Sequence, residues 1–109
     1  MNQLAQCTPC RKGDKGLTPE EIRRALQHLP GWELFVDGTA IRKSWKFQNF
    51  REALAFVNRV GEVAEEQNHH PDIELGWGYV RLAFTTHAIG GLHRNDFIMA
   101  EKVEQVASS

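Results

Sequence analysis

The chain lacks any strong excess of charge and any long apolar run. Its 109 residues include 13 Lys and Arg against 14 Asp and Glu, a formal net charge of −1. Without a basic excess, no overall field attracts nucleic acid or an anionic membrane. No apolar run approaches the roughly 20 residues that a membrane-spanning helix needs, and residues 1–8 lack the basic and apolar parts of a signal peptide. We therefore expect a cytoplasmic protein with no nucleic-acid partner and no membrane association.

Cysteine is also scarce, since the chain has only two. They form Cys7-Thr8-Pro9-Cys10, too few for the disulfide framework of a small secreted domain. One Cys-x2-Cys pair is half of a zinc site, and the other two ligands are not evident. No thioredoxin-like βαβ pattern surrounds the pair. Three interpretations stay open: an inert tail, metal binding and a redox pair.

The length and composition are those of one globular domain with one core. Residues 1–16 are polar and contain two glycines and several charges, which is typical of a flexible tail. We expect a flexible tail over residues 1–16 and a single domain over residues 17–109.

The first half of the domain predicts a helix and then a β-hairpin. Thr18 can cap the helix and Glu21 can return the capping bond, and the helix should end at Pro30-Gly31. Asp37-Gly38 between two apolar-rich runs indicates a tight hairpin turn, because both turn positions need positive φ. The second strand alternates, with Lys43 as an exception on its apolar face.

The second half predicts a helix over residues 50–68, two strands around 73–75 and 79–86, and a helix over 92–106. The element order is αββαββα. We expect an α+β fold in which a four-stranded antiparallel sheet has three helices packed on one face.

The apolar positions of the helix over 50–68 cover about half of its cylinder, whereas one sheet face needs a stripe of only about 100°. The excess width indicates a second buried surface, so we expect a homodimer or homotetramer formed through this helix or through sheet edges. A deeply seated helix in a monomer is the alternative.

Three histidines occur with two carboxylates and one aromatic within about a third of the chain: Glu65, His69, His70, Trp77, His87 and Asp96. Histidine titrates nearest neutral pH, so a cluster of imidazoles indicates acid–base chemistry. Glu65 and His69 are four residues apart and share a helix face if the helix reaches that far, so the carboxylate can hold one imidazole nitrogen. Each residue also has a plainer interpretation: a surface pair, helix-end caps, or core packing for Trp77.

A metal site is the main competitor, because three histidines can hold a catalytic zinc. Ligand pairs on one regular element usually stand four residues apart, whereas His69 and His70 are adjacent. We therefore expect no metal.

The chain resembles the pterin-4a-carbinolamine dehydratases in one spaced string, Glu65-x3-His69-His70-Pro71-x5-Trp77-x9-His87-x8-Asp96. The resemblance extends from about residue 18 to 106 and includes Gly31-Trp32. It implies a dehydratase that removes water from 4a-hydroxytetrahydropterin, the spent cofactor of aromatic amino-acid hydroxylases, to give a quinonoid dihydropterin. It also implies that no metal or organic cofactor is used.

Residue roles follow only from this resemblance. The implied catalytic residues are His69, His70 and His87, with His70 also orienting the pterin. The implied substrate-binding residues are Trp32, Glu65, Asn68, Thr86 and Asp96. Some animal members also serve as a dimerisation cofactor of a homeodomain transcription factor, so a binding module is the second hypothesis. A third is a protein of the same fold that serves another pathway, such as one with a different pterin cofactor.

Overall fold

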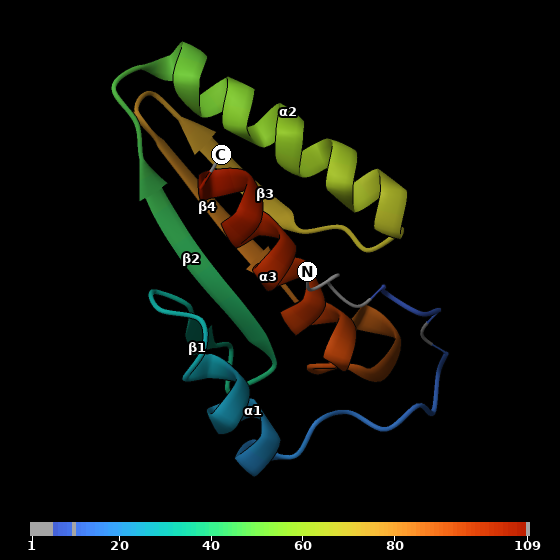
Figure 1. Ribbon diagram of the computed structural model, residues 1–109. Helices are drawn as coiled ribbons and strands as arrows, with labels where there is room; N and C mark the ends of the chain where they lie inside the picture. The colour runs from blue at the N-terminus through green and yellow to red at the C-terminus, as the bar shows by residue number, and fades with distance from the viewer. Residues whose placement is uncertain (1–5, 10, 109) are drawn as a thin grey trace.

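The computed structural model of the chain describes residues 6–9 and 11–108. It contains three helices and four strands in the order α1 Pro19–Leu26, β1 Glu33–Phe35, β2 Ala40–Lys46, α2 Phe50–Gln67, β3 Asp72–Gly76, β4 Tyr79–Phe84 and α3 Arg94–Ser108, with a 3₁₀ turn η1 at His87–Ile89 before α3. The strands form one antiparallel sheet in the order β1-β2-β4-β3. This arrangement confirms the α+β fold predicted from the sequence (Figure 1).

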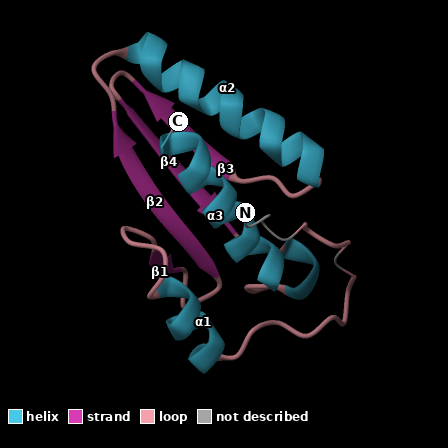
Figure 2. Cartoon of the chain, in the orientation of Figure 1, coloured by secondary structure: helices cyan, strands magenta, loops and turns pink. Residues whose placement is uncertain are grey.

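The helices cover one face of the sheet, and the core lies between the two layers (Figure 2). Strand β4 alternates as expected, with Val80, Leu82 and Phe84 fully buried toward the helices. Helix α2 contributes a buried stripe at helical spacing: Ala53, Phe56, Val60, Ala64 and Gln67. Gln67 is polar, and its hydrogen-bond partners, Gln6 and Cys7, lie outside the predicted domain of residues 17–109.

Local sequence signals account for the starts of α1 and α2 and for the end of α2. The expected end of α1 at Pro30-Gly31 was wrong, because the helix stops at Leu26 and the chain continues in turns, with the His28 and Leu29 amides donating to carbonyls three residues back. Thr18 caps α1, and Thr18 and Glu21 form the predicted capping box. Asn49 caps α2 by accepting a bond from the Glu52 amide. Helix α2 ends at Asn68, whose left-handed conformation (φ 53°) turns the chain away from the helix axis, a conformation that asparagine tolerates better than most residues.

The hairpin at Asp37-Gly38 is present, but a two-residue turn was the wrong expectation. Phe35 pairs with Ala40, so four residues form the loop, and Val36, Asp37 and Gly38 all have positive φ. The Thr39 amide and hydroxyl both donate to the Val36 carbonyl, at 3.1 and 2.6 Å. These local bonds stabilise a wider turn than the dipeptide alone predicts.

Lys43, the charged exception on the apolar face of β2, forms an ion pair with Glu104 of α3. Its ammonium donates to Glu104 Oε2 of α3 at 2.7 Å, and the Trp32 indole N–H donates to the same oxygen at 2.9 Å. A cation on an apolar strand face is therefore tolerated because a carboxylate from α3 reaches it.

The wide apolar stripe of α2 is only partly covered. Phe50 and Leu54 are 44% and 39% exposed, whereas Val57 and Val63 pack against the core. The homodimer or homotetramer stays a prediction. No helix in the part of the chain that the structure describes is long and apolar enough to cross a membrane.

The described part of the tail contacts the domain through hydrogen bonds to Gln67 and Asn95. Cys10 lies outside the described residues, so the three interpretations of the cysteine pair remain predictions, as do the flexibility of residues 1–16 and the domain boundary at residue 17.

Candidate functional site

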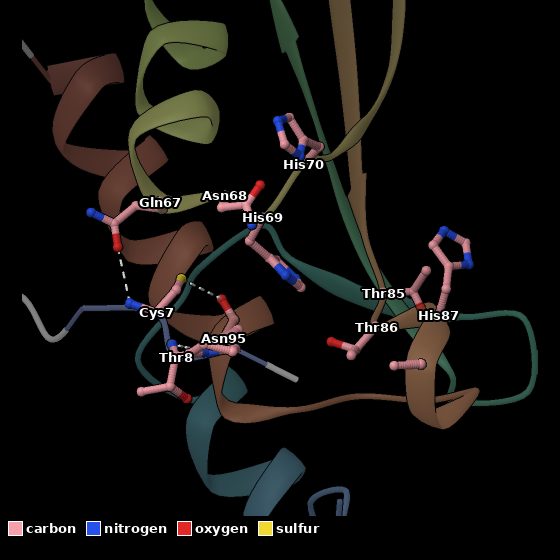
Figure 3. Close-up of a pocket in the computed structure, with 12 residues that line it drawn as sticks. Cys7, Thr8, Gln67, Asn68, His69, His70, Thr85, Thr86, His87 and Asn95 are labelled. Carbon is pink, nitrogen blue, oxygen red and sulfur yellow. Dashed lines mark hydrogen bonds between the residues drawn. The ribbon is translucent and has the colours of Figure 1, made fainter. Parts of the chain in front are cut away.

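The three histidines line one cavity of about 530 Å³ (Figure 3). The size is within the range of small-molecule sites, which is about 300–1,000 Å³. His69 and His70 come from the loop after α2, and His87 begins η1 just after strand β4. The complete lining is Cys7, Thr8, Pro9, Gln67, Asn68, His69, His70, Thr85, Thr86, His87, Ala88 and Asn95.

His69 is the most constrained of the three. Its side chain is 12% exposed, and its Nε2 lies 2.7 Å from Asp96 Oδ1. Its ring lies nearly parallel to that of Phe84, with centroids 6.3 Å apart and an interplanar angle of 12°. Contact with an aromatic ring and a buried carboxylate restricts the imidazole to one orientation.

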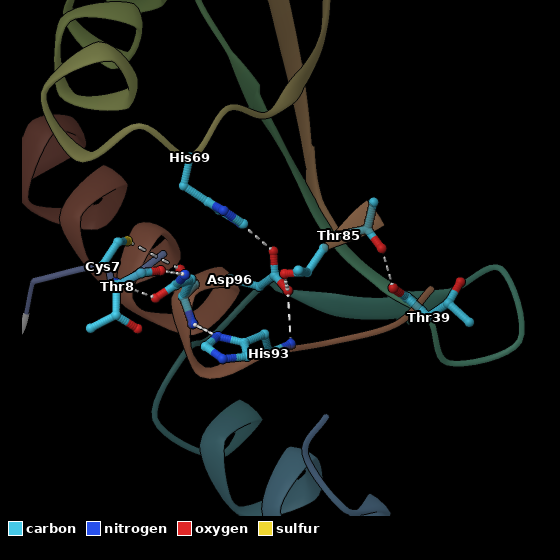
Figure 4. A network of polar contacts seen from close by, with 9 residues as sticks. Cys7, Thr8, Thr39, His69, Thr85, His93 and Asp96 are labelled. Atoms are coloured by element: carbon cyan, nitrogen blue, oxygen red, sulfur yellow. Dashed lines mark hydrogen bonds and ion pairs between the residues drawn. The ribbon is translucent and has the colours of Figure 1, made fainter. Parts of the chain in front are cut away.

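Asp96 is fully buried in the first turn of α3 and does not line the cavity. Its Oδ2 accepts bonds from the Thr86 hydroxyl at 2.7 Å and the His93 amide at 2.9 Å, so three groups surround the carboxylate (Figure 4). When all three donate, the carboxylate is in its acceptor-only form. The proton of neutral His69 then resides on Nε2, and Nδ1 is left as the acceptor.

His70 pairs with Glu65, its Nε2 lying 2.5 Å from Glu65 Oε2. The sequence had paired Glu65 with His69, which was wrong. Helix α2 ends at Gln67, and the left-handed Asn68 rotates His69 away from the face that carries Glu65. The pair is exposed, at 50% and 79%, and exposed ion pairs contribute only about 0–1 kcal/mol.

His87 is exposed at the cavity rim. Its ring has no hydrogen-bond partner among residues 6–9 and 11–108, so no hydrogen bond within that range fixes its orientation. The loop around it closes through the Thr86 amide, which donates to the Gly91 carbonyl at 2.9 Å. His87 is therefore placed by backbone geometry and His69 by side-chain contacts.

The structure brings some of the predicted binding residues to the cavity and not others. Asn68 and Thr86 line it, and Glu65 reaches it only through His70. Trp32 is buried in the core, where its ring packs on Phe84 with centroids 6.0 Å apart. Trp77 is 73% exposed at the β3–β4 turn and does not line the cavity.

Several lining residues were missed by the sequence reasoning, notably Gln67, Asn95 and the tail residues 7–9. Gln67 had a signal, because it continues the buried spacing of α2. Asn95 had none. Within the described residues, no group of three or more His, Cys, Asp or Glu side chains is arranged to hold a metal ion.

The chain matches a protein-family model described as "Pterin 4 alpha carbinolamine dehydratase" over residues 15–106. A relative from Methylococcus capsulatus is 52% identical over 103 residues, 94% of this chain and 90% of its own length. A relative from Rubrobacter xylanophilus is 53% identical over 108 residues, 97% of this chain and 100% of its own. Both names assign these proteins provisionally to the pterin-4-alpha-carbinolamine dehydratases.

Two solved structures resemble this one. The crystal structure of a "transcriptional coactivator/pterin dehydratase" from Brucella melitensis superposes with a TM-score of 0.81 at 32% identity, over 85% of this chain and 99% of that one. A "pterin dehydratase-like protein", titled a RuBisCO assembly factor in the alpha-carboxysome, has a TM-score of 0.64 at 23% identity, over 75% and 95%, and this likeness shows the fold alone. The family match and the relatives together show that the chain belongs to the pterin 4 alpha carbinolamine dehydratase family.

Proposed function

We propose that this protein removes water from a 4a-hydroxytetrahydropterin by histidine general acid–base catalysis. The product is a quinonoid dihydropterin, and the step serves the recycling of the pterin cofactor used by an aromatic amino-acid hydroxylase. The observation that carries the proposal is that His69, His70 and His87 line one cavity in a member of this family.

The reaction requires one proton to be delivered and one to be removed. The C4a–O bond breaks as an acid protonates the leaving hydroxyl, which departs as water. A base removes the N5 proton, and the N5 electron pair forms the C4a=N5 double bond. Imidazole serves either role near neutral pH, and one positioned acid or base contributes about 10²–10⁴ in rate. The proposal needs no metal and no organic cofactor.

His69 and His87 are the proposed acid–base pair. Asp96 holds Nε2–H of His69 at 2.7 Å, which leaves Nδ1 to take up and return protons. The arrangement has the logic of a catalytic triad, in which a buried carboxylate orients an imidazole and selects its tautomer. Asp96 is thus a positioning residue that acts through His69.

The remaining lining residues would bind the ring. We propose that His70 and Asn68 contact the polar edge of the pterin, with Glu65 holding His70 in place at 2.5 Å. Thr86 would act chiefly through Asp96, because its hydroxyl donates to that carboxylate. Trp32 would contribute only by supporting Phe84 behind His69.

A stopped-flow assay with synthetic 4a-hydroxytetrahydropterin tests the proposal. We expect His69→Ala and His87→Ala each to lower kcat by about 10²-fold or more, and the double variant to approach the uncatalysed rate with an unchanged circular dichroism spectrum. His28→Ala is the matched control, because His28 is exposed and lies outside the cavity lining. Full activity in both single variants would overturn the assignment.

A protein-binding role is the second candidate function. The Brucella melitensis relative is titled a transcriptional coactivator as well as a dehydratase, and Phe50 and Leu54 leave apolar surface exposed on α2. A pure binding module does not need imidazoles in a cavity and would not catalyse the dehydration. An inactive wild type in the stopped-flow assay would therefore favour this second function.

A further inference from the structure

Two buried amide side chains that line the cavity are not used by the proposed chemistry. Gln67 is 9% and Asn95 2% exposed. A buried primary amide needs partners for both its oxygen and its nitrogen. Both side chains find these partners in the N-terminal segment 6–9, which we call the strap. The strap lies outside residues 15–106, the part that matches the family model.

The side-chain amide of Asn95 binds the backbone of the strap as the backbone of a neighbouring β-strand would. Its Oδ1 accepts from the Thr8 amide at 3.0 Å, and its Nδ2 donates to the Thr8 carbonyl at 2.6 Å. Both polar groups of one backbone residue are thus satisfied by one side chain, as in an antiparallel pair. The Cys7 thiol adds a contact of 3.8 Å to the Asn95 carbonyl.

Gln67 holds the two preceding residues through one backbone group and one side chain. Its Oε1 accepts from the Cys7 amide at 2.9 Å, and its Nε2 donates to Gln6 Oε1 at 2.7 Å. Farther along, the Leu17 amide donates to the Leu92 carbonyl at 2.9 Å, so the chain between the strap and α1 is attached to the domain near both of its ends. Figure 1 shows this segment passing the N-terminal end of α3.

The strap contributes Cys7, Thr8 and Pro9 to the cavity lining. Figure 3 shows Cys7 and Thr8 on one side of His69 and His87 on the other. None of the three imidazoles belongs to the strap. We propose that the strap is a wall of the substrate cavity, and that Gln67 and Asn95 are positioning residues that hold this wall against the pterin ring. The inference rests on the proposed dehydration, which supplies the substrate.

A wall that supplies neither of the proposed acid–base residues, His69 and His87, has a specific kinetic consequence. Displacing it weakens contact with the substrate in the ground state and the transition state alike, which raises KM and leaves kcat nearly unchanged. The loss of one hydrogen bond corresponds to a change of about threefold to tenfold in an equilibrium constant. A purely structural role for the strap would not produce this split between KM and kcat.

The test compares two proline substitutions in the full chain. Thr8→Pro removes the backbone N–H that donates a hydrogen bond to Asn95 Oδ1. Lys12→Pro is the matched control, because Lys12 is the second residue of a turn in which the Asp14 amide donates to the Arg11 carbonyl and Gly13 has φ +97°, a position that proline favours. In the stopped-flow assay we expect Thr8→Pro to raise KM about threefold to tenfold, with kcat within about twofold, and Lys12→Pro to match the wild type.

Asn95→Asp supplies a second route to the same contact. It keeps an acceptor for the Thr8 amide and loses the donor to the Thr8 carbonyl, so KM should rise again. The double variant with Thr8→Pro should be no worse than the more affected single variant, because both changes break one contact. An unchanged KM in Thr8→Pro, or a fall in kcat without a rise in KM, would overturn the strap as a substrate wall.

A binding measurement separates this inference from the proposed function. If the wild type does not dehydrate the substrate, the proposed function fails. The strap is then tested by fluorescence titration with 7,8-dihydropterin, which has the flat ring and lacks the 4a hydroxyl. A dissociation constant about threefold to tenfold higher in Thr8→Pro would support the wall. Equal affinities, or no binding by the wild type, would overturn it.

Discussion

Replacing Asp96 by asparagine changes one atom of the carboxylate that orients His69. An asparagine offers one acceptor oxygen and one donor nitrogen, whereas three groups surround the native side chain. The Thr86 hydroxyl and the His93 amide converge on Oδ2, so the amide oxygen should take that side. The amide nitrogen would then face Nε2 of His69 and donate to it.

This exchange moves the proton of His69. With a donor opposite Nε2, the neutral ring must carry its proton on Nδ1, and the nitrogen that the proposed mechanism uses is no longer an acceptor. A change of this kind in the serine-protease triad lowers kcat by about 10⁴, and loss of one general acid or base costs about 10²–10⁴. We expect Asp96→Asn to lower kcat by at least about 10²-fold. We expect an accompanying fall in the free energy of unfolding of about 1–3 kcal/mol, because a hydrogen bond to a charged group is replaced.

Three measurements check this prediction. Stopped-flow dehydration gives kcat, urea denaturation gives the free energy of unfolding, and ¹⁵N NMR of the imidazole reports which nitrogen carries the proton. Asp37→Asn is the matched control, because Asp37 is exposed in a turn with φ 54° that asparagine also adopts. A kcat for Asp96→Asn within about twofold of the wild type would refute the reasoning that Asp96 works through the tautomer of His69.

Three further predictions concern the fold, the first cap and assembly. Phe84→Ala should lower the free energy of unfolding by about 3–5 kcal/mol in urea denaturation, because Phe84 is fully buried. The Thr18 amide and then its hydroxyl lower the pKa of Glu21 from its usual 4.5. The ionised Glu21 carboxylate therefore contributes to stability above the usual pKa of 4.5, and this contribution is lost as pH falls through the lower pKa of the folded state. In urea denaturation, the wild type should accordingly lose free energy of unfolding relative to Glu21→Gln on acidification. Leu54→Glu should convert a homo-oligomer to a folded monomer in size-exclusion chromatography with light scattering, because the exposed apolar face of α2 would acquire a charge.

Controls accompany these three predictions. Trp77→Ala should lower the free energy of unfolding by less than about 1 kcal/mol, since Trp77 is 73% exposed and surface substitutions have small effects. A decrease as large as that of Phe84→Ala would contradict the assignment of Phe84 to the core. An advantage of the wild type over Glu21→Gln that grows on acidification would contradict the direction of the pKa change. Arg51→Glu is the charge control for assembly, and a wild type that is already monomeric at micromolar concentration would exclude the oligomer.

Local physics made much of the fold predictable. The capping box at Thr18, the helix end before His69 and the alternation of β4 are decided by neighbouring residues, whose preferences survive folding. The hairpin was correct in position and wrong in width, because the register Phe35↔Ala40 depends on pairing within the sheet and on bonds of the Thr39 side chain.

The partners of the histidines were not predictable in the same way. The four-residue spacing of Glu65 and His69 holds only while a helix continues, and α2 ends two residues before His69. The true partner, Asp96, lies 27 residues away in sequence. Trp32, implied as a cavity wall, packs behind Phe84, because the burial of a large aromatic is decided by all the elements that surround it.

The amino-acid sequence determined the element order, the starts of the first two helices and the identity of the imidazoles, because each depends on spacing and on the preferences of adjacent residues. The tertiary structure alone decided which carboxylate meets which imidazole and what residues 6–9 touch. These contacts join positions between 5 and 88 residues apart, and chain separation carries no information about them until the helices pack on the sheet.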